Sequence, residues 1–298
     1  MNKKMMFFYI SLTLPMVFLA MENPTVDNPA IVVVWSKNRE NRSFEDRCMY
    51  QYRPKIGHIL GMFDGHGGWQ TSSYLANSLS VHLEQQNDDN PCINISNALL
   101  AANKAVKGFN DGSTATVVNI VGGKCHFGQV GDSRAVLGSI VKSGYYMIDF
   151  FTQDHKPEGD ERERVKAAGG GVFNEYVYVE PCLGGLAMTR SIGDYAKDPE
   201  KKVIIATPEC TTRDVFNADD GTYLVLATDG LWDELSNEDV FHTIGYGITH
   251  GGNLSDITKM LVEAAVRRGS ADDITCMLVD LKALADDKKA SLEIIDAT

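Results

Sequence analysis

Residues 59–68 read Ile-Leu-Gly-Met-Phe-Asp-Gly-His-Gly-Gly, an apolar run that passes directly into a carboxylate and a glycine-rich bend. The run extends back to residue 56, and its β-branched and aromatic side chains predict a buried strand over 56–63. Asp64 then lies at the edge of the core, where a carboxylate without compensation is costly to desolvate. The glycines allow a ligand to approach the backbone closely, and His66 sets an imidazole two residues from the carboxylate.

Other acidic residues stand in a similar setting. Directly beside a further apolar run lie Asp132, Asp229, Asp272 and Asp273, and two more acidic positions are the pair Glu45-Asp46 and Asp233. Asp-Gly pairs are also common turn residues, and this chain has others at 111–112 and 220–221. Taken together, however, several converging carboxylates can be neutralised by a hard divalent cation, which prefers oxygen ligands.

Strand signals outnumber helical ones along the chain. Strands are expected at 31–35, 56–63, 116–121, 126–130, 135–140, 145–152, 223–228 and 274–281. Helices are expected at 69–83, 160–168, from 237 onward and at 255–268. The strands come in hairpin-like runs, notably over 116–152, which favours an antiparallel α+β protein over a parallel doubly wound one.

The composition narrows the class of protein. The chain has 298 residues, 44% of them hydrophobic, and a net charge of −12 from 28 Lys and Arg against 40 Asp and Glu. It is long enough to bury a sizeable core, and its acidic balance argues against a nucleic-acid partner. The six cysteines form no Cys-x-x-Cys pair, so a thiolate metal site is not expected.

The first twenty residues differ from the rest. Lys3 and Lys4 precede an apolar run over 5–20, which is typical of a secretory signal peptide at 1–20. We therefore expect entry into the secretory pathway, with a secreted, vacuolar or exported product. Two alternatives stay open: an uncleaved membrane anchor, which is the one route to a membrane partner, and an unused leader on a cytoplasmic or nuclear protein.

The chemistry that suits this set of acids is two-metal hydrolysis. Two divalent ions about 4 Å apart share a water, lower its pKa and clamp the oxygens of an in-line displacement at phosphorus. Mg²⁺ or Mn²⁺ fits aspartate ligands, because both prefer hard oxygen donors. The leaving alkoxide needs a proton, and His66 is the candidate donor.

The motifs, taken in order, resemble those of the metal-dependent protein Ser/Thr phosphatases of type 2C, also called PPM-type phosphatases. They are Phe44-Glu-Asp46, Phe63-Asp-Gly-His-Gly-Gly68, Gly112-Ser-Thr-Ala115, Val130-Gly-Asp-Ser-Arg134, Thr152-Gln-Asp-His-Lys-Pro157, Gly185-Leu-Ala-Met-Thr-Arg-Ser-Ile-Gly-Asp194, Leu226-Ala-Thr-Asp-Gly-Leu-Trp-Asp233 and Ser270-Ala-Asp-Asp-Ile-Thr275. The resemblance implies one phosphatase domain over 25–281, followed by a polar tail at 282–298. It also implies a four-layer αββα sandwich, in which two antiparallel β-sheets are flanked by helices.

The resemblance assigns roles to single residues. It implies that Asp64 bridges two metal ions, that the Gly65 carbonyl binds one of them, and that Asp229 and Asp272 are further direct ligands. Glu45 and Asp46 match acids that hold metal-bound waters, while Asp132 and Asp233 match a third, weaker metal site. His66 matches the proposed general acid. Asp273 takes a place usually held by Asn, and a structural ion pair between Arg190 and Asp194 is expected.

One departure concerns the substrate phosphate. The family commonly has an Arg five residues before the Asp of Glu-Asp, and Asn41 stands there in this chain. The neighbouring Arg42 is the candidate phosphate ligand. The expected activity is hydrolysis of phosphoserine and phosphothreonine in phosphorylated proteins by a monomer. Two alternatives are a catalytically weak pseudophosphatase that acts as a protein-binding module, and a small-molecule phosphatase with the same metals.

Overall fold

The computed structural model describes residues 29–37, 43–141, 143–180, 184–215, 221–286 and 292–297. The predicted signal peptide at 1–20 and the candidate phosphate ligand Arg42 lie outside these ranges. Within the described ranges, no helix is both long enough and apolar enough to span a membrane.

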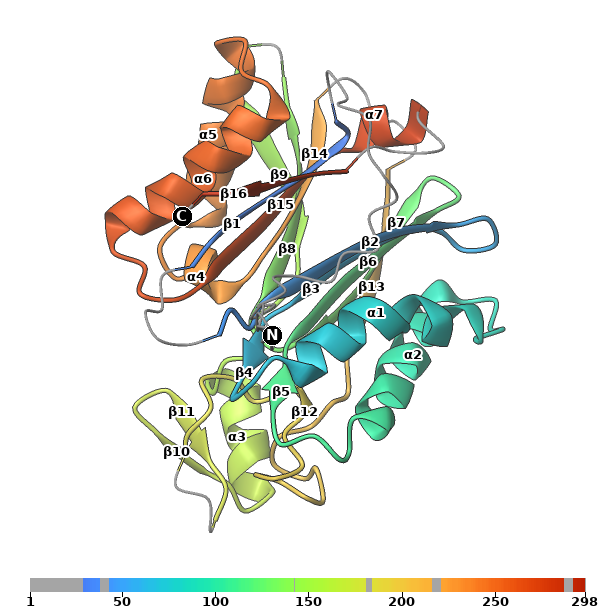
Figure 1. The fold of residues 1–298 in the computed structure, drawn as a ribbon, viewed down its shortest axis with the longest axis vertical. Coiled ribbons are helices and arrows are strands. Elements are labelled where there is room, and N and C mark those ends of the chain that lie inside the picture. The colour runs from blue at the N-terminus through green and yellow to red at the C-terminus, as the bar shows by residue number, and fades with distance from the viewer. Residues whose placement is uncertain are drawn as a thin grey trace, which may run out of the picture.

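Two large sheets form the centre of the molecule (Figure 1). Sheet A has the strand order β16 (Leu292–Asp296), β1 (Ile31–Ser36), β15 (Ile274–Asp280), β14 (Thr222–Ala227), β8 (Arg134–Ile140) and β9 (Tyr146–Phe151). Sheet B has the order β13 (Glu209–Asp214), β7 (Lys124–Val130), β6 (Ala115–Val121), β3 (Gly57–Phe63) and β2 (Arg47–Arg53). Neighbouring strands are antiparallel in both sheets, except that β16 runs parallel to β1.

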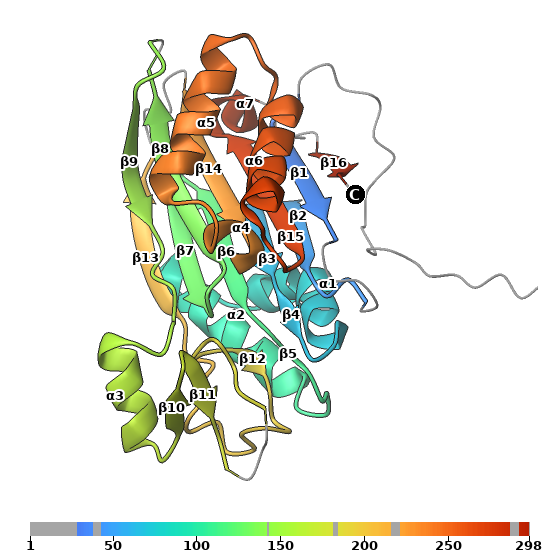
Figure 2. The same ribbon diagram turned by 90° about the vertical axis from the view of Figure 1, so that its left-hand side faces the viewer.

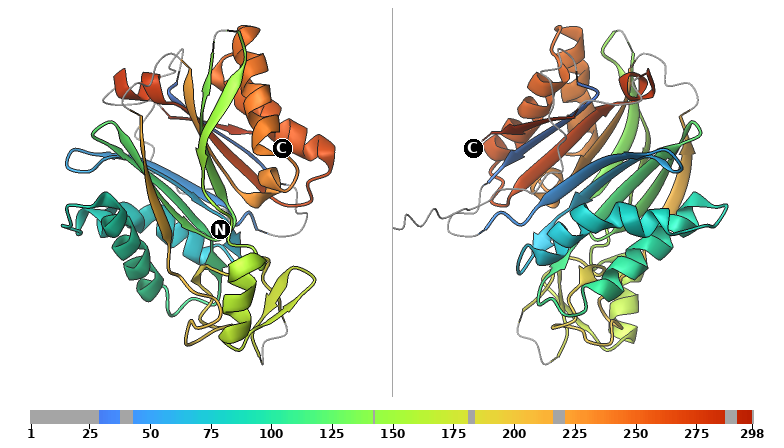
Figure 3. Two further views of the ribbon diagram at one scale, coloured as in Figure 1. Left: turned by 180° about the vertical axis from the view of Figure 1, so that it is seen from behind. Right: turned by 45° about the vertical axis from the view of Figure 1, so that its right-hand side comes forward.

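Helices cover the outer face of each sheet, as Figure 1 and both views of Figure 3 show. Sheet A carries α5 (Asn237–Thr249) and α6 (Leu254–Arg268), while sheet B carries α1 (Gln70–Glu84) and α2 (Pro91–Ala105). The short helices α4 (Asp229–Trp232) and α7 (Leu281–Asp286) follow β14 and β15. The predicted four-layer αββα sandwich is therefore confirmed.

Alternation along β1 explains how this strand serves two layers. Val32 and Val34 pack toward α5 and α6, whereas Ile31 and Val33 pack between the two sheets. Successive side chains of a strand point to opposite faces, so a strand covered on both faces is apolar throughout. A third core, with Phe63, lies between sheet B and its helices.

A smaller lobe projects from one end of the sandwich (Figure 2). It contains α3 (Gly159–Ala167) and the hairpin of β10 (Gly171–Phe173) and β11 (Tyr176–Tyr178), with its own apolar cluster around Val165 and Val177. Three two-residue strands link this lobe to the sandwich in the order β12 (Ile192–Gly193), β5 (Gly112–Ser113) and β4 (Gly65–His66).

The expected hairpins over 116–152 are confirmed, with β6 and β7 paired in sheet B and β8 and β9 paired in sheet A. Two details differ from the sequence analysis. The segment 282–298, taken as a polar tail, contains most of α7 and all of β16, whose pairing with β1 extends sheet A. Helix α2 and strands β2 and β13 were not foreseen.

Candidate metal centre

Most of the predicted metal ligands follow or precede a strand of the two large sheets, whereas Gly65 lies in β4 and Asp233 follows α4. Asp64 directly follows β3, and Asp229 opens α4 immediately after β14. Asp272 stands just before β15, where its carboxylate accepts a hydrogen bond from the backbone N–H of Asp273 at 2.7 Å. Asp132 lies in the connection between β7 and β8. Acids that adjoin sheet B and acids that adjoin sheet A are close enough to interact electrostatically, since Asp229, Asp272 and Asp132 all act on Asp64.

Electrostatics shows how closely these carboxylates lie. Burial raises the pKa of Asp64 well above its ordinary value, and the negative charges of Asp46, Asp229, Asp272 and Asp132 raise it further. For Asp229, burial and then the charge of Asp132 raise the pKa to about 7. The negative charge of each acid raises the free energy of the ionised form of its neighbours. A bound cation would relieve this repulsion.

Two buried oxygens fit a cation directly. Within the described ranges, Oδ1 of Asp229 and Oδ1 of Asp132 are buried and accept no hydrogen bond. A buried carboxylate oxygen normally finds a donor, so its absence is unusual. Within those ranges, no group of three or more acidic, histidine or cysteine side chains is already gathered around a metal position. The argument for a cation therefore rests on these two oxygens without donors and on the oxygen ligands, which hard divalent cations prefer.

Glu45 and Asp46 lie at the same centre, just before β2. The Glu45 carbonyl accepts a hydrogen bond from the Ser72 hydroxyl at 2.6 Å, and a Cβ at Gly65 would lie 2.6 Å from that carbonyl. Asp46 is buried and accepts hydrogen bonds from Thr275 at 2.8 Å and Thr228 at 3.1 Å. Asp46 therefore joins β2 to the ends of β14 and β15.

Lys156 stands among the acids assigned to the third metal site. Its ammonium lies 2.5 Å from Asp132, and 3.9 Å from both Asp229 and Asp233. Burial alone would lower the pKa of Lys156, but these carboxylates, Asp132 foremost, outweigh burial and raise it. No role in the centre was predicted for the motif at 152–157, so Lys156 was not foreseen there. The sequence did carry a signal, because Lys156 is the single Lys or Arg in the motif at 152–157.

His66 forms β4 with Gly65 and faces a carboxylate that the sequence analysis paired with another residue. Its Nε2 lies 2.6 Å from Oδ2 of Asp194, whose side chain is fully buried. The predicted ion pair between Arg190 and Asp194 is wrong. Arg190 instead pairs with Glu161 at 2.7 Å and with Glu209 at 3.0 Å, because the chain turns at Gly193 and directs Asp194 toward β4.

Asp111 anchors the glycine-rich loop from the other side. Its carboxylate accepts hydrogen bonds from the backbone N–H of Gln70 at 2.7 Å and from the Thr71 hydroxyl at 2.5 Å, at the start of α1. Gly68 has φ +150°, and a Cβ there would lie 2.6 Å from Oδ2 of Asp111. The absence of a side chain at Gly68 therefore lets the loop close onto this cap.

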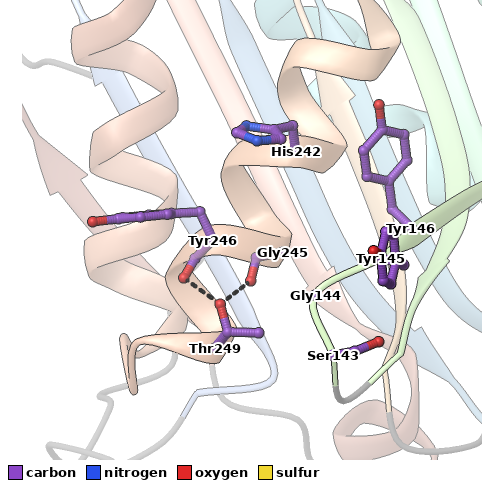
Figure 4. A pocket seen from close by; sticks show the side chains of 8 residues that line it. All are labelled: Ser143, Gly144, Tyr145, Tyr146, His242, Gly245, Tyr246 and Thr249. Carbon is purple, nitrogen blue, oxygen red and sulfur yellow. Dashed lines mark hydrogen bonds between the residues drawn. The ribbon is translucent and has the colours of Figure 1, made fainter.

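A pocket lies elsewhere, between the turn that joins β8 to β9 and helix α5 (Figure 4). Tyr145, His242 and Tyr246 line it, and the Thr249 hydroxyl closes one side by donating to the Gly245 carbonyl at 2.8 Å. No acidic side chain lines this pocket, so it is separate from the metal centre.

Comparisons with known proteins give the family of this chain. A family model described as Protein phosphatase 2C matches residues 34–274. Probable protein phosphatase 2C 28 of Arabidopsis thaliana is 36% identical over 256 residues, which cover 82% of this chain and 70% of that protein. Human Protein phosphatase 1B is 29% identical over 251 residues, which cover 74% of this chain and 50% of that protein. The chain thus spans about half the length of this second relative.

A solved structure shares the fold. The serine-threonine phosphatase 2C from Toxoplasma gondii matches with a TM-score of 0.70 at 22% identity, over 85% of this chain and 97% of that chain. At this identity the likeness establishes the fold, while the family model and the plant relative establish the family. The chain belongs to the protein phosphatase 2C family, the metal-dependent phosphatases of serine and threonine in proteins.

Proposed function

We propose that this chain hydrolyses phosphoserine and phosphothreonine in proteins at the metal centre described above. The observation that carries the proposal is the meeting of carboxylates from both sheets, with buried oxygens of Asp229 and Asp132 that accept no hydrogen bond within the described residues. A site of this charge would repel a phosphate group unless cations were bound to it. A metal-dependent phosphatase resolves that conflict.

Particular residues would hold the ions. Asp64 is suited to bridge two of them, with the Gly65 carbonyl on one side and Asp229 and Asp272 completing the direct ligands. Glu45 and Asp46 would act through water. When bound, Mg²⁺ or Mn²⁺ would activate a water for in-line attack on phosphorus. A third ion between Asp132 and Asp233 would have to displace the Lys156 ammonium, which makes that site the weakest.

His66 would act as the general acid that protonates the leaving oxygen. It lies two residues from the bridging Asp64, and within the described ranges its buried Nδ1 has no hydrogen-bond partner. An imidazole nitrogen without a protein partner can donate its proton once a substrate oxygen reaches it, and general acid catalysis of this kind contributes roughly 10²- to 10⁴-fold to a rate. The side chain thus supplies the proton that a seryl or threonyl oxygen needs to leave.

A turnover assay tests this proposal against the alternatives. Purified protein is given a phosphoserine peptide, a phosphothreonine peptide and a small phosphomonoester with Mn²⁺, and calorimetry measures Mn²⁺ binding in parallel. We expect binding together with turnover of both peptides. Mn²⁺ binding without turnover would instead identify a pseudophosphatase that acts as a binding module, and turnover confined to the small ester would identify a small-molecule phosphatase.

A further inference from the structure

We infer that Asp194 is a positioning residue for His66: its buried carboxylate holds Nε2 and so directs Nδ1 to the leaving oxygen of the substrate. The inference rests on the proposed role of His66 as the general acid. Asp194 itself is 128 residues away in sequence and belongs to no metal-ligand motif. Its carboxylate lies 2.6 Å from Nε2 of His66.

The small sheet β12-β5-β4 builds this contact. Gly193 of β12 is paired with Gly112 of β5, and Gly112 is paired on its other side with His66 of β4. Asp194 follows β12 directly with φ 55°, in the left-handed region, and its N–H donates to the Asp111 carbonyl at 3.1 Å. The backbone accepts a conformation that is uncommon for a non-glycine residue, and this conformation places the carboxylate against the imidazole.

Gly112 leaves the room that the pair needs. A Cβ on Gly112 would overlap both Oδ2 of Asp194 and Nε2 of His66. Gly112 is not in the left-handed region, so a turn does not require the glycine. Its missing side chain instead permits the close approach of the two functional groups on either side of it.

The surroundings keep Asp194 ionised. Burial alone would raise the pKa of Asp194, but His66, the Lys197 ammonium at 3.0 Å and the Ser191 hydroxyl at 2.6 Å outweigh it and hold the pKa well below its ordinary value. An ionised carboxylate only accepts hydrogen bonds. A proton on Nε2 can therefore be donated to Asp194 at 2.6 Å, which leaves Nδ1 as the ring nitrogen with no protein partner within the described ranges.

The reaction step balances with this assignment. A water oxygen forms the new bond to phosphorus while one of its protons passes to solvent. The bond between phosphorus and the seryl or threonyl oxygen breaks, and its electron pair stays on that oxygen. The oxygen takes the Nδ1 proton of the imidazolium. The products are an alcohol, phosphate and a neutral His66 whose Nε2–H still donates to Asp194.

Comparing substrates with different leaving groups distinguishes a positioning role of Asp194 from a purely structural one. The oxygen of p-nitrophenyl phosphate leaves without a proton, whereas the seryl oxygen of a phosphopeptide needs one. Asp194→Asn should therefore lower kcat on a phosphoserine peptide by about 10- to 100-fold. On p-nitrophenyl phosphate we expect a loss of less than about threefold, because general acid catalysis is not used there. Near-ultraviolet circular dichroism and Mn²⁺ calorimetry check that fold and metal binding are retained.

A second variant keeps both functional side chains. Gly112→Ala should separate the pair and give the same selective loss on the phosphopeptide, even if Asp194→Asn does not fold. The matched control is Gly108→Ala, because Gly108 has open space around its Cβ position and lies outside the metal centre. We expect Gly108→Ala to behave as the unaltered protein on both substrates.

His66→Gln and the double variant complete the test. If Asp194 acts through His66, Asp194→Asn should cost nothing further on the phosphopeptide once His66→Gln is present. If His66→Gln is selective but Asp194→Asn and Gly112→Ala slow both substrates equally, the positioning role is wrong and the proposed function stands. If His66→Gln itself shows no leaving-group dependence, the acid role proposed for His66 fails, and the inference fails with it.

Discussion

At the scale of single residues, Asp229 shows the energetic cost of the metal centre. It opens α4 at the end of a buried strand, its Oδ1 accepts no hydrogen bond within the described ranges, and burial and neighbouring charge raise its pKa to about 7. Such a carboxylate opposes folding when it is ionised and no cation is present. A bound cation would remove this cost, as the proposed function requires.

Replacement of Asp229 should therefore separate activity from stability. In Asp229→Asn, we expect phosphopeptide hydrolysis with Mn²⁺ to fall by at least about 10²-fold, since a direct ligand is lost. The melting temperature of the metal-free protein should not fall, because a buried charge has been removed. Thermal denaturation in chelator and steady-state kinetics measure the two effects. Near-normal turnover would show that the ligand assignment is wrong.

The contribution that Asp229 makes to stability depends on pH with a definite sign. The folded-state pKa of Asp229, about 7, lies above its ordinary value of 3.8. Between these values the folded protein holds a proton that the unfolded chain has released, so the Asp229 contribution to the free energy of unfolding falls as pH rises toward 7. His155, with a pKa lowered to about 3 chiefly by burial, has the opposite slope.

His155 is present in both Asp229→Asn and the unaltered protein, so its contribution to stability cancels when the two are compared. The melting temperature of metal-free Asp229→Asn, minus that of the unaltered protein, should increase from pH 5 to pH 8. The same denaturation experiment at several pH values measures it. A difference that stays constant or shrinks as pH rises would contradict the raised pKa of Asp229.

At the scale of elements, helix α1 is capped by a residue distant in sequence. Trp69 at its N-cap forms no side-chain cap, and Asp111 accepts the bonds from Gln70 and Thr71 instead. Unsatisfied N–H groups at a helix start cost stability. Because α1 follows the loop of Asp64 and His66 directly, this cap also fixes the loop.

Asp111→Ala should therefore lower both stability and activity. The expected loss is about 1–3 kcal/mol in the free energy of unfolding, with a several-fold lower kcat. Asn90→Ala is the matched control, since Asn90 caps α2 on an exposed part of the chain. It should cost about 1 kcal/mol and leave kcat unchanged. Urea denaturation and kinetics measure both variants, and unchanged kcat in Asp111→Ala would refute the link between cap and loop.

The elements that the sequence predicted well have clear local patterns. The strand at 56–63 and the helix at 255–268 agree with β3 and α6 to within a residue. Strand β13, Glu209–Asp214, was missed because its residues are polar and it is a strand at the edge of sheet B, held by pairing with β7. Helix α2 was missed although its start is marked in the sequence, with Asn90 as its N-cap and Pro91 as its first residue.

The same distinction applies to the site. Each proposed ligand is marked by its own motif, so Asp64, Asp229 and Asp272 could be proposed from sequence. The partner of Asp194 could not be, because a pairing across 128 residues depends on the placement of β12 beside β5 and β4. Lys156 illustrates the same limit, since its acids come from two segments far from it in sequence, Asp132 from one and Asp229 and Asp233 from the other.

At the scale of the whole molecule, the proposed metal centre lies where the two sheets meet. Asp64 follows a strand of sheet B, while Asp229 and Asp272 adjoin strands of sheet A. Cations bound between them would link the two halves of the sandwich and relieve the repulsion. A ligand that binds only the folded state stabilises it by about 2.7 kcal/mol at 100 times its Kd.

Mn²⁺ should accordingly raise the melting temperature by about 5–10 °C at that saturation. Asp229→Asn, at the same Mn²⁺ concentration, should show a much smaller rise. Differential scanning calorimetry with Mn²⁺ or with chelator measures both. An equal rise in the two proteins would mean that Mn²⁺ binds elsewhere.

The central claim is that these carboxylates hold the metal ions on which phosphoprotein hydrolysis depends. Phosphate release from a phosphoserine peptide, measured with Mn²⁺ and with excess chelator, tests it most directly. We expect steady release with Mn²⁺, none above background in chelator, and recovery when Mn²⁺ is restored. Full activity in excess chelator, or no release with Mn²⁺, would contradict it.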